Sequence, residues 1–578
     1  MILLYNFDKF EKKFGRLCTI LKKRQHYISL IILMLIVSII TYYRVMIQVS
    51  IGPTEDTYSY LSNALVFAGQ GMGYSDLIRP PVIPFLTSII FRLGYVSPTA
   101  IFAVDSIIFV FGVIGLYLLL RTRFSDMESL LGALLFVTFP VTLSFIGFGL
   151  TDIPSLSFSI WAIYFTVLAV KKNSKFFYLS FPFLMLAFLT KYAIAFFIFP
   201  MLLYILINRR FVKNIKDIII GILLSLLFII PVLLFFYSTF GNPLNPFFNF
   251  YGSTATSSSI SSENFAYNSD LFYFLFRIPI YIGIESIAVF TVILFGIVAW
   301  GMNNLKKVRS TTKGLFNAHD LEKPTKIKLL LTSILLIIFV GTLGNVFYML
   351  SEVIFFVFLF GLYELLKSFD IHDLDLHFLF LSWFMAFFIF QSVYPIKIDR
   401  YFLTMAPPIA YFLILGLSKV SHSLNFKIRT KTKIFNFFAA VLIVLMLFSA
   451  LSYLPVFHKN MHEVKVANEE MNSASQWLTN YDPNYKNETI YSDKWSAFAW
   501  YLKTNVMMMP FFKDNQMYYY GVKDENINIK DNSAFNSYLE DNNVDYYFSV
   551  RKGLNLTGYK PIKQFGDVII YEKVENVQ

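Results

Sequence analysis

Five ionisable residues, far apart along the chain, stand at or near the ends of long apolar runs: Asp56, Arg79, Asp152, Lys191 and Arg400. A charged side chain deep in hydrocarbon costs about 2.5–3.5 kcal/mol on insertion scales, so such residues usually serve a function. Carboxylates can accept a proton or bind a cation, and lysine and arginine can bind an anion such as a phosphate. These residue types indicate a site for proton transfer and anion binding, provided that the fold brings them together.

Each of these residues also has a simpler interpretation when it is taken alone. Asp152 precedes an Ile-Pro pair and suits the start of a helix, and Arg400 can pair with Asp399 or extend toward the membrane surface. Because the set holds both acids and bases, a shared site is the better interpretation. Three further acids either join this layer or have a structural role, which we favour for each: Asp105, Glu285 and Glu352.

The elements that position these residues are membrane helices, because the composition excludes a soluble protein. Of the 578 residues, 56% are hydrophobic and 15% are charged, whereas soluble domains carry about 25% charged residues. Since about 20 apolar residues cross a bilayer as a helix, we predict a polytopic α-helical membrane protein. The thirteen predicted spans are roughly 28–47, 99–120, 127–146, 152–170, 176–190, 192–208, 217–239, 278–302, 329–349, 352–366, 377–394, 401–418 and 434–455, with the ninth and tenth meeting near Ser351.

The distribution of lysine and arginine predicts the orientation of the spans in residues 1–455. With the N-terminus in the cytoplasm, 29 of the 49 basic residues fall on the inner side, seven at the outer side and 13 after residue 455. Cytoplasmic loops are enriched in positive charge, so the net charge of +12 is a topology signal and not a sign of nucleic-acid binding. We therefore expect a multi-pass protein of the cell membrane whose five ionisable residues lie at the extracytoplasmic face.

Three long segments fall on the predicted outer face. Residues 48–98 contain two stretches, 57–68 and 81–93, whose mixed apolar pattern is typical of interfacial helices. Residues 241–277 are rich in serine, asparagine and glycine, and we expect a flexible loop that is either a plain surface segment or a lid. In residues 456–578, short strands alternate with helical stretches, which predicts a small extracytoplasmic α/β domain. Its predicted strands are 488–492, 506–511, 544–550 and 567–572, and its predicted helices are 465–479 and 534–541.

The order of motifs along the chain resembles the GT-C glycosyltransferases, specifically the branch of protein O-mannosyltransferases and lipid A aminoarabinose transferases. The motifs are Asp56 before Tyr60 and Leu61, Arg79-Pro80-Pro81 before Pro84, Asp152 at the start of a span, Thr190-Lys191-Tyr192, and Arg400-Tyr401 before Pro407-Pro408. Two positions depart from the family: Thr57 follows Asp56 where the family often has Glu, and Arg79 stands where the aminoarabinose transferases have Lys. The chain lacks a W-W-D-Y-G run, which argues against the oligosaccharyltransferase branch.

The resemblance implies transfer of one sugar from a polyprenyl-phosphate donor to an acceptor hydroxyl at the outer membrane face, with inversion. In that reaction Asp56 is the expected general base, and Arg79, Lys191 and Arg400 are expected to bind the donor phosphate. Asp152 either positions the acceptor, tunes Asp56 or completes a Mg²⁺ or Mn²⁺ site with it, since the family members differ in metal dependence. Substrate contacts are expected from two residues beside Asp56, namely Glu55 and Tyr60.

The expected partners are the lipid-linked donor, membrane lipids and an acceptor that is a protein, a glycan or a lipid. Two other classes of protein also handle lipid-linked saccharides, namely transporters or flippases and polymerases or ligases. A transporter favours internal repeats and polar groups near the bilayer midplane, whereas this chain has no repeat and its charges lie at the outer ends of spans. A polymerase or ligase is less well separated. The enzyme interpretation requires Asp56 and Asp152 to meet in one cavity.

Overall fold

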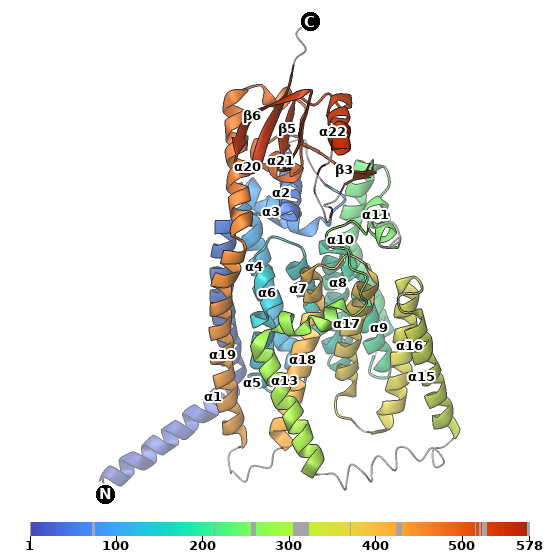
Figure 1. The fold of residues 1–578 in the computed structure, drawn as a ribbon. Coiled ribbons are helices and arrows are strands. Elements are labelled where there is room, and N and C mark those ends of the chain that lie inside the picture. Colours follow the sequence, from blue (N-terminus) through green and yellow to red (C-terminus); the bar gives the residue numbers. More distant parts are fainter. Residues whose placement is uncertain are drawn as a thin grey trace.

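The computed structural model is an elongated bundle of helices that carries a small α/β domain at one end, with the N-terminus at the other (Figure 1). We call the end that carries this C-terminal domain, residues 462–574, the domain end. The structure describes residues 2–71, 76–212, 214–255, 262–303, 323–369, 371–423, 431–514, 516–519, 522, 527 and 529–574.

Within these residues, ten helices are long and apolar enough to cross a membrane. They are α1 (Ile2–Ile51), α4 (Pro98–Leu120), α7 (Asp152–Lys171), α10 (Ile215–Phe240), α13 (Ile278–Asn303), α15 (Lys323–Thr342), α16 (Tyr348–Leu366), α17 (Leu374–Val393), α18 (Ala406–Ser423) and α19 (Lys431–Asn460). Helix α7 is the most enclosed, since 83% of its apolar window is buried in the protein, against 11% for α10. The residue at the N-terminus of α7, Asp152, is therefore surrounded by protein rather than by lipid.

The other three predicted spans are shorter or broken helices. They are α5 (Asp126–Thr138) with α6 (Pro140–Phe145), α8 (Phe177–Thr190), and η2 (Tyr192–Phe197) with α9 (Ile198–Ile207). The first break falls before Pro140, which has no N–H with which to continue the helical hydrogen bonds. The second falls at Lys191, whose backbone is extended. The predicted fold class, a polytopic helical membrane protein with a C-terminal α/β domain, is confirmed.

The junction between the ninth and tenth predicted spans differs from the prediction. The turn lies at residues 343–347 rather than at Ser351, because α15 ends at Thr342 and α16 begins at Tyr348. Gly344 has a φ of +78°, a backbone conformation that glycine adopts without steric cost. Gly344 and Asn345 are the local turn signal, but they stand within a long apolar stretch, so hydropathy alone did not locate the turn.

The C-terminal domain contains a five-stranded mixed sheet of order β2-β1-β5-β7-β6. The β1 strand pairs in parallel with β2 and β5, whereas β7 pairs antiparallel with β5 and β6. Its elements are α20 (His462–Tyr481), β1 (Ile490–Ser492), α21 (Trp495–Leu502), β2 (Met507–Met508), the hairpin of β3 (Phe511–Lys513) and β4 (Gln516–Tyr518), α22 (Ile529–Asp541), β5 (Tyr546–Ser549), β6 (Tyr559–Phe565) and β7 (Val568–Lys573). The edge strand β6 escaped prediction because its largely exposed residues show no apolar alternation.

Short elements fill the space between the bundle and the C-terminal domain. Helices α2 (Glu55–Phe67) and α3 (Val82–Arg92) lie beneath this domain, beside the upper part of the bundle (Figure 1). The segment 241–277 contains two further helices, α11 (Asn245–Ala255) and α12 (Tyr273–Phe276), and its Glu263 lies 3.3 Å from the amine of Lys513 in β3. The domain end is therefore a layer of short helices enclosed by protein on two sides.

The close packing of α4 against α7 generates a first prediction. A methyl group on Gly112 of α4 would lie 2.8 Å from the Cα of Ser157 in α7, too close for both backbones to remain in place. We expect Gly112→Ala to destabilise the protein by about 1–3 kcal/mol, measured as a lower thermal midpoint in detergent. Gly341→Ala in α15 is the matched control, because no heavy atom lies within 4 Å of its added methyl group. Equal midpoints for the two variants would contradict this packing.

Candidate active site

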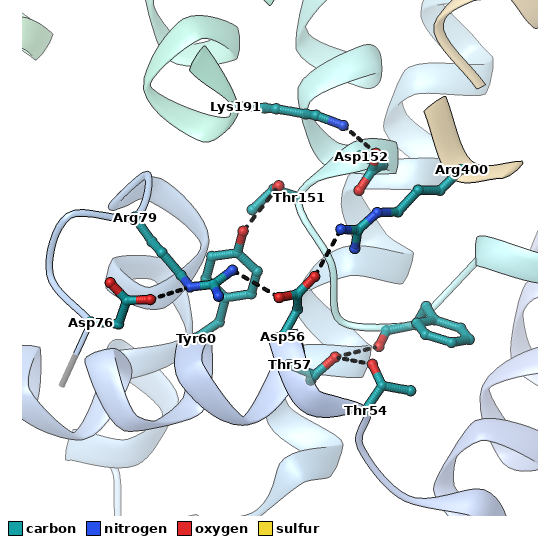
Figure 2. Close-up of polar contacts among 11 residues, drawn as sticks. Thr54, Asp56, Thr57, Tyr60, Asp76, Arg79, Thr151, Asp152, Lys191 and Arg400 are labelled. Carbon is teal, nitrogen blue, oxygen red and sulfur yellow. Dashed lines mark hydrogen bonds and ion pairs between the residues drawn. The ribbon is translucent and has the colours of Figure 1, made fainter. Parts of the chain in front are cut away.

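Five separate elements deliver the five ionisable side chains to one place at the domain end (Figure 2). Asp56 is the second residue of α2, Asp152 is the first residue of α7, and Lys191 occupies the break between α8 and η2. Arg400 lies in η5 (Asp399–Met405), and Arg79 lies in the turn before α3. The predicted convergence of these residues therefore occurs in the structure.

Asp56 is held between two guanidinium groups. Its Oδ1 accepts a hydrogen bond of 3.0 Å from Nη1 of Arg79, and its Oδ2 lies 2.8 Å from Nη2 of Arg400. The Asp56 side chain is 31% exposed, so the carboxylate remains accessible from one direction. The same two arginines that the sequence nominates for phosphate binding are thus paired with the nominated base.

The electrostatic environment of Asp56 favours its ionised form. Burial acts to raise the pKa of its carboxyl group, but the charges of Arg400 and Arg79 and their hydrogen bonds outweigh burial and lower the pKa to about 2. While both arginines are in place, Asp56 is a weak base. Its basicity depends on whether another anion takes over these cations.

Asp152 forms a second ion pair, with Lys191. The Asp152 side chain is almost fully buried, and its position at the first turn of α7 places its negative charge near the positive end of the helix dipole. The amine of Lys191 also lies 5.1 Å from the ring centroid of Tyr401, over the ring. In Figure 2, Arg400 extends between Asp152 and Asp56, so the two carboxylates share one polar layer.

Arg400 retains hydrogen-bonding capacity that the described residues do not satisfy. Its Nε is buried and makes no hydrogen bond to the residues that the structure describes. Buried guanidinium N–H groups are nearly always paired in native proteins, so this donor is open to a water molecule or to an oxygen of a ligand. An oxygen of an anionic ligand is the natural partner for such a group.

Two residues beside Asp56 were predicted to contact substrate. The ring of Tyr60 lies 5.4 Å from the guanidinium carbon of Arg79, and its hydroxyl lies 3.4 Å from Oγ1 of Thr151. Tyr60 therefore packs within the site, although it is buried. Glu55 is the first residue of α2, and its side chain lies outside the described residues.

Sequence reasoning missed one member of the ion-pair network, Asp76. Its Oδ2 accepts a hydrogen bond of 2.6 Å from Nε of Arg79, and its backbone is held by the side chain of Asn63. An acid three residues before Arg79 was the available signal, because such spacing in a turn allows direct pairing. With Asp76 included, three carboxylates face three cations in this layer.

The residues present do not fit the divalent metal that was left open at Asp56 and Asp152. Among the residues that the structure describes, no three His, Cys, Asp or Glu side chains gather in a metal-binding arrangement. The charges of Asp56 and Asp152 are already balanced by arginine and lysine. We therefore derive no step through a metal ion.

One family model matches part of this chain, and several solved structures resemble its fold. Residues 78–235, which contain Arg79, Asp152 and Lys191, match the family model described as dolichyl-phosphate-mannose-protein mannosyltransferase. ArnT from Cupriavidus metallidurans, in a crystal structure bound to undecaprenyl phosphate, superposes with a TM-score of 0.53 at 12% identity, over 94% of this chain and 98% of that chain. ArnT is a member of the GT-C superfamily. This chain has the GT-C fold.

Two further crystal structures share the GT-C fold of this chain. The apo state of the same ArnT superposes with a TM-score of 0.51 at 11% identity, over 90% of this chain and 94% of that chain. The apo oligosaccharyltransferase of Archaeoglobus fulgidus gives a TM-score of 0.51 at 15% identity, over 91% of this chain and 70% of that chain. No curated protein matches the chain by sequence. The resemblance to GT-C proteins that the sequence predicts is confirmed. At identities of 11–15%, the structural similarity establishes the fold.

The pairing of Asp56 predicts a pH-dependent contribution to stability. Its pKa falls from about 3.9 in an unfolded chain to about 2 in the folded protein. The stabilisation is therefore present above about pH 4 and is lost as the pH falls toward about 2. We expect Asp56→Asn to unfold at a lower temperature than the wild type at pH 5, with a difference that shrinks on acidification.

Thermal midpoints in detergent over this pH range test the expectation. Glu469→Gln is the matched control, because this glutamate of α20 is 65% exposed and lies outside the site. A difference between wild type and Asp56→Asn that stays constant from pH 5 to about pH 2 is incompatible with the ion pairs described for Asp56.

Proposed function

We propose that this chain is a membrane glycosyltransferase that moves one sugar from a polyprenyl-phosphate donor to an acceptor hydroxyl, with inversion. The observation that carries the proposal is the pairing of Asp56 with both Arg79 and Arg400 at the domain end. A base and two phosphate-binding groups in direct contact are what a single displacement with a phosphate leaving group requires. The GT-C fold and the family match over residues 78–235 support the same reaction class.

The donor phosphate activates Asp56 by exchanging ion-pair partners. As phosphate oxygens bind Arg79, Arg400 and the orphan Nε of Arg400, the carboxylate of Asp56 loses the charges that lower its pKa. Burial then raises its pKa, so the carboxylate becomes a stronger base only when the donor is in place. This order limits proton abstraction to the loaded enzyme.

The transfer forms one bond and breaks one bond, and it moves one proton and one electron pair. The acceptor oxygen attacks the anomeric carbon, the bond from that carbon to the phosphate oxygen breaks, and the acceptor proton passes to Asp56. Polyprenyl phosphate leaves with the electron pair, and Arg79 and Arg400 stabilise its negative charge. A single displacement on the face opposite the phosphate inverts the anomeric configuration.

Asp152 and Lys191 complete the site from the other side of Arg400. The ion pair between them holds the amine of Lys191 at the break before η2, within the layer where the phosphate binds. We assign Lys191 to the donor phosphate and Asp152 to positioning the acceptor and Arg400. Glu55 precedes Asp56 in the sequence and Tyr60 follows it by four residues, and both are assigned to substrate contact.

The excess of basic residues in the loops at the other end supports an extracytoplasmic domain end, and we assign the meeting of lipid-linked donor and acceptor to that side. The donor lipid enters from the surrounding membrane, and the acceptor is a protein, a glycan or a lipid. A transporter or flippase is a weaker assignment, because the charged residues stand at helix ends rather than within the long spans: Asp56 and Asp152 lie in the first turns of α2 and α7, and Lys191 follows α8. A polymerase or ligase shares the donor class and differs in the acceptor.

Asp56→Asn tests the base. Asparagine cannot take the proton, so we expect kcat to fall about 10²–10⁴-fold while undecaprenyl phosphate still binds, since both arginines remain. The assay incubates purified protein with a panel of polyprenyl-phosphate sugars and detects products by mass spectrometry. Asp567→Asn, an exposed carboxylate in the β6–β7 turn, should retain full activity. A fully active Asp56→Asn would remove Asp56 from the reaction.

Arg400→Ala tests the phosphate site. Loss of a charge-assisted contact in a partly buried site weakens binding by about 10–100-fold, and we expect this loss in the affinity for undecaprenyl phosphate. Arg121→Ala is the matched control, because this arginine at the C-terminus of α4 pairs with Asp126 and lies outside the site. Unchanged affinity in Arg400→Ala would exclude Arg400 from the donor site.

A further inference from the structure

We infer that the C-terminal domain sets the position of the catalytic carboxylate, with Asn468 and Tyr501 as positioning residues. The inference rests on the proposed function of Asp56 and extends it to a domain that carries none of the five ionisable residues. Asn468 lies in α20, and Tyr501 lies in α21. Both side chains contact the segment that immediately surrounds Asp56.

The side-chain amide of Asn468 forms hydrogen bonds with the turn that leads into α2. Its Nδ2 donates hydrogen bonds of 2.9 Å to the carbonyl oxygens of both Ile51 and Pro53. Gly52 between them has a φ of +91°, and a methyl group at this position would lie 2.7 Å from Nδ2 of Asn468. The turn is therefore shaped around the asparagine amide, with glycine required on both conformational and steric grounds.

A second set of hydrogen bonds holds α2 just after Asp56. The hydroxyl of Tyr58 donates a hydrogen bond of 2.9 Å to Oδ1 of Asn468 and lies 2.7 Å from the hydroxyl of Tyr501. Because the amide nitrogen of Asn468 is committed to two carbonyl groups, its oxygen is the acceptor. This fixes the direction of both hydrogen bonds: the hydroxyl of Tyr501 donates to that of Tyr58, and the hydroxyl of Tyr58 donates to Asn468.

The contacts on the other side of α2 come from the membrane domain. Oγ1 of Thr57 donates to the carbonyl of Phe148 at 3.2 Å, and the hydroxyl of Tyr60 lies 3.4 Å from Thr151, the residue before Asp152. The first turn of α2 is thus held between the bundle and the C-terminal domain. We call this set of contacts, from Phe148 and Thr151 on one side and Asn468 and Tyr501 on the other, the clamp. Asp56 stands inside this clamp, between the anchors at Pro53 and Tyr58.

The clamp controls geometry because its contacts are directional and buried. Tyr58 and Asn468 are 1% and 6% exposed, so hydrogen bonds there are not exchanged freely with water. Ring contacts of Tyr58 with Tyr501, at 5.7 Å, and of Phe91 with Trp500, at 6.2 Å, add adhesion between the domains. A displacement of about 1 Å at a catalytic group can cost about 100-fold in rate. We therefore assign Asn468 and Tyr501 to catalysis through Asp56.

The test compares Asn468→Ala and Tyr501→Phe with two matched controls. The controls are Asn472→Ala and Tyr481→Phe. Asn472 lies one turn after Asn468 in α20, and Tyr481 has an exposed hydroxyl at the end of the same helix. We measure kcat and KM for a polyprenyl-phosphate sugar, the pH dependence of kcat/KM, and the affinity for undecaprenyl phosphate. Asn468→Ala should lower kcat at least 10-fold and Tyr501→Phe several-fold, without raising KM for the donor.

Two readouts separate positioning from simple stabilisation. When Asp56 moves away from its arginines, its pKa rises, so the acidic limb of kcat/KM shifts to higher pH in Asn468→Ala. The freed arginines also bind undecaprenyl phosphate more tightly at pH 7 than in the wild type. The controls should match the wild type in both measurements. If Asn468→Ala fails to fold, Tyr501→Phe removes a single oxygen atom and carries the same test.

Two outcomes decide the matter. Variants with reduced thermal stability but wild-type kcat, pH profile and phosphate affinity would overturn the inference, because the contacts would then serve folding alone. If the wild type transfers no sugar, the proposed function fails. The affinity measurement still tests the clamp in that case, since tighter binding in Asn468→Ala reports release of Asp56 from Arg79 and Arg400, and equal binding overturns it.

Discussion

One carboxylate shared by two guanidinium groups is the interaction on which the arrangement of the domain end depends. Asp56 joins Arg79, from the turn before α3, to Arg400, from η5. Neither arginine is adjacent to Asp56 in sequence, so the pairing draws three elements into one layer. In a site of low dielectric, three cations facing three carboxylates keep the net charge near zero, and under the proposed function an arriving phosphate takes the place of Asp56 at the two arginines.

The breaks in the membrane helices follow from the same site. Backbone N–H and C=O groups at membrane depth must be satisfied, so irregular backbone occurs only where protein encloses it. The break at Lys191 and the 3₁₀ segment η5 both lie against the N-terminal part of α7, the most enclosed of the membrane helices. At the break itself, the amine of Lys191 pairs with Asp152.

Much of this arrangement could be predicted from the sequence, because apolar run length and the order of charged residues are local signals. Hydropathy located the membrane helices, and charges at the ends of apolar runs located Asp56, Asp152 and Lys191. Asp76 was missed because it lies in a polar turn. An acidic residue is ordinary in such a segment, whereas an acidic residue at the end of an apolar run is not. The turn at Gly344 was missed because its signal, Gly344 and Asn345, is only two residues long and stands within a long apolar stretch.

The tie between α2 and the C-terminal domain lay beyond sequence reasoning for a different reason. Asn468 and Tyr58 are 410 positions apart, and nothing in the neighbourhood of either marks it as a partner of the other. Uncharged polar residues in an amphipathic helix such as α20 are ordinarily solvated, so a buried asparagine has no distinctive pattern. Only the folded coordinates bring the amide onto the turn before Asp56.

The same separation along the chain has a consequence for biogenesis. Chains are synthesised from the N-terminus, and the first turn of α2 emerges long before Asn468 and Tyr501, which follow it by more than 400 residues. A nascent polypeptide that already holds Asp56, Arg79 and Arg400 still lacks the upper half of the clamp. Premature release by the ribosome, or a truncation before α20, therefore yields a helical bundle in which the first turn of α2 lacks the hydrogen bonds of Asn468 and Tyr501.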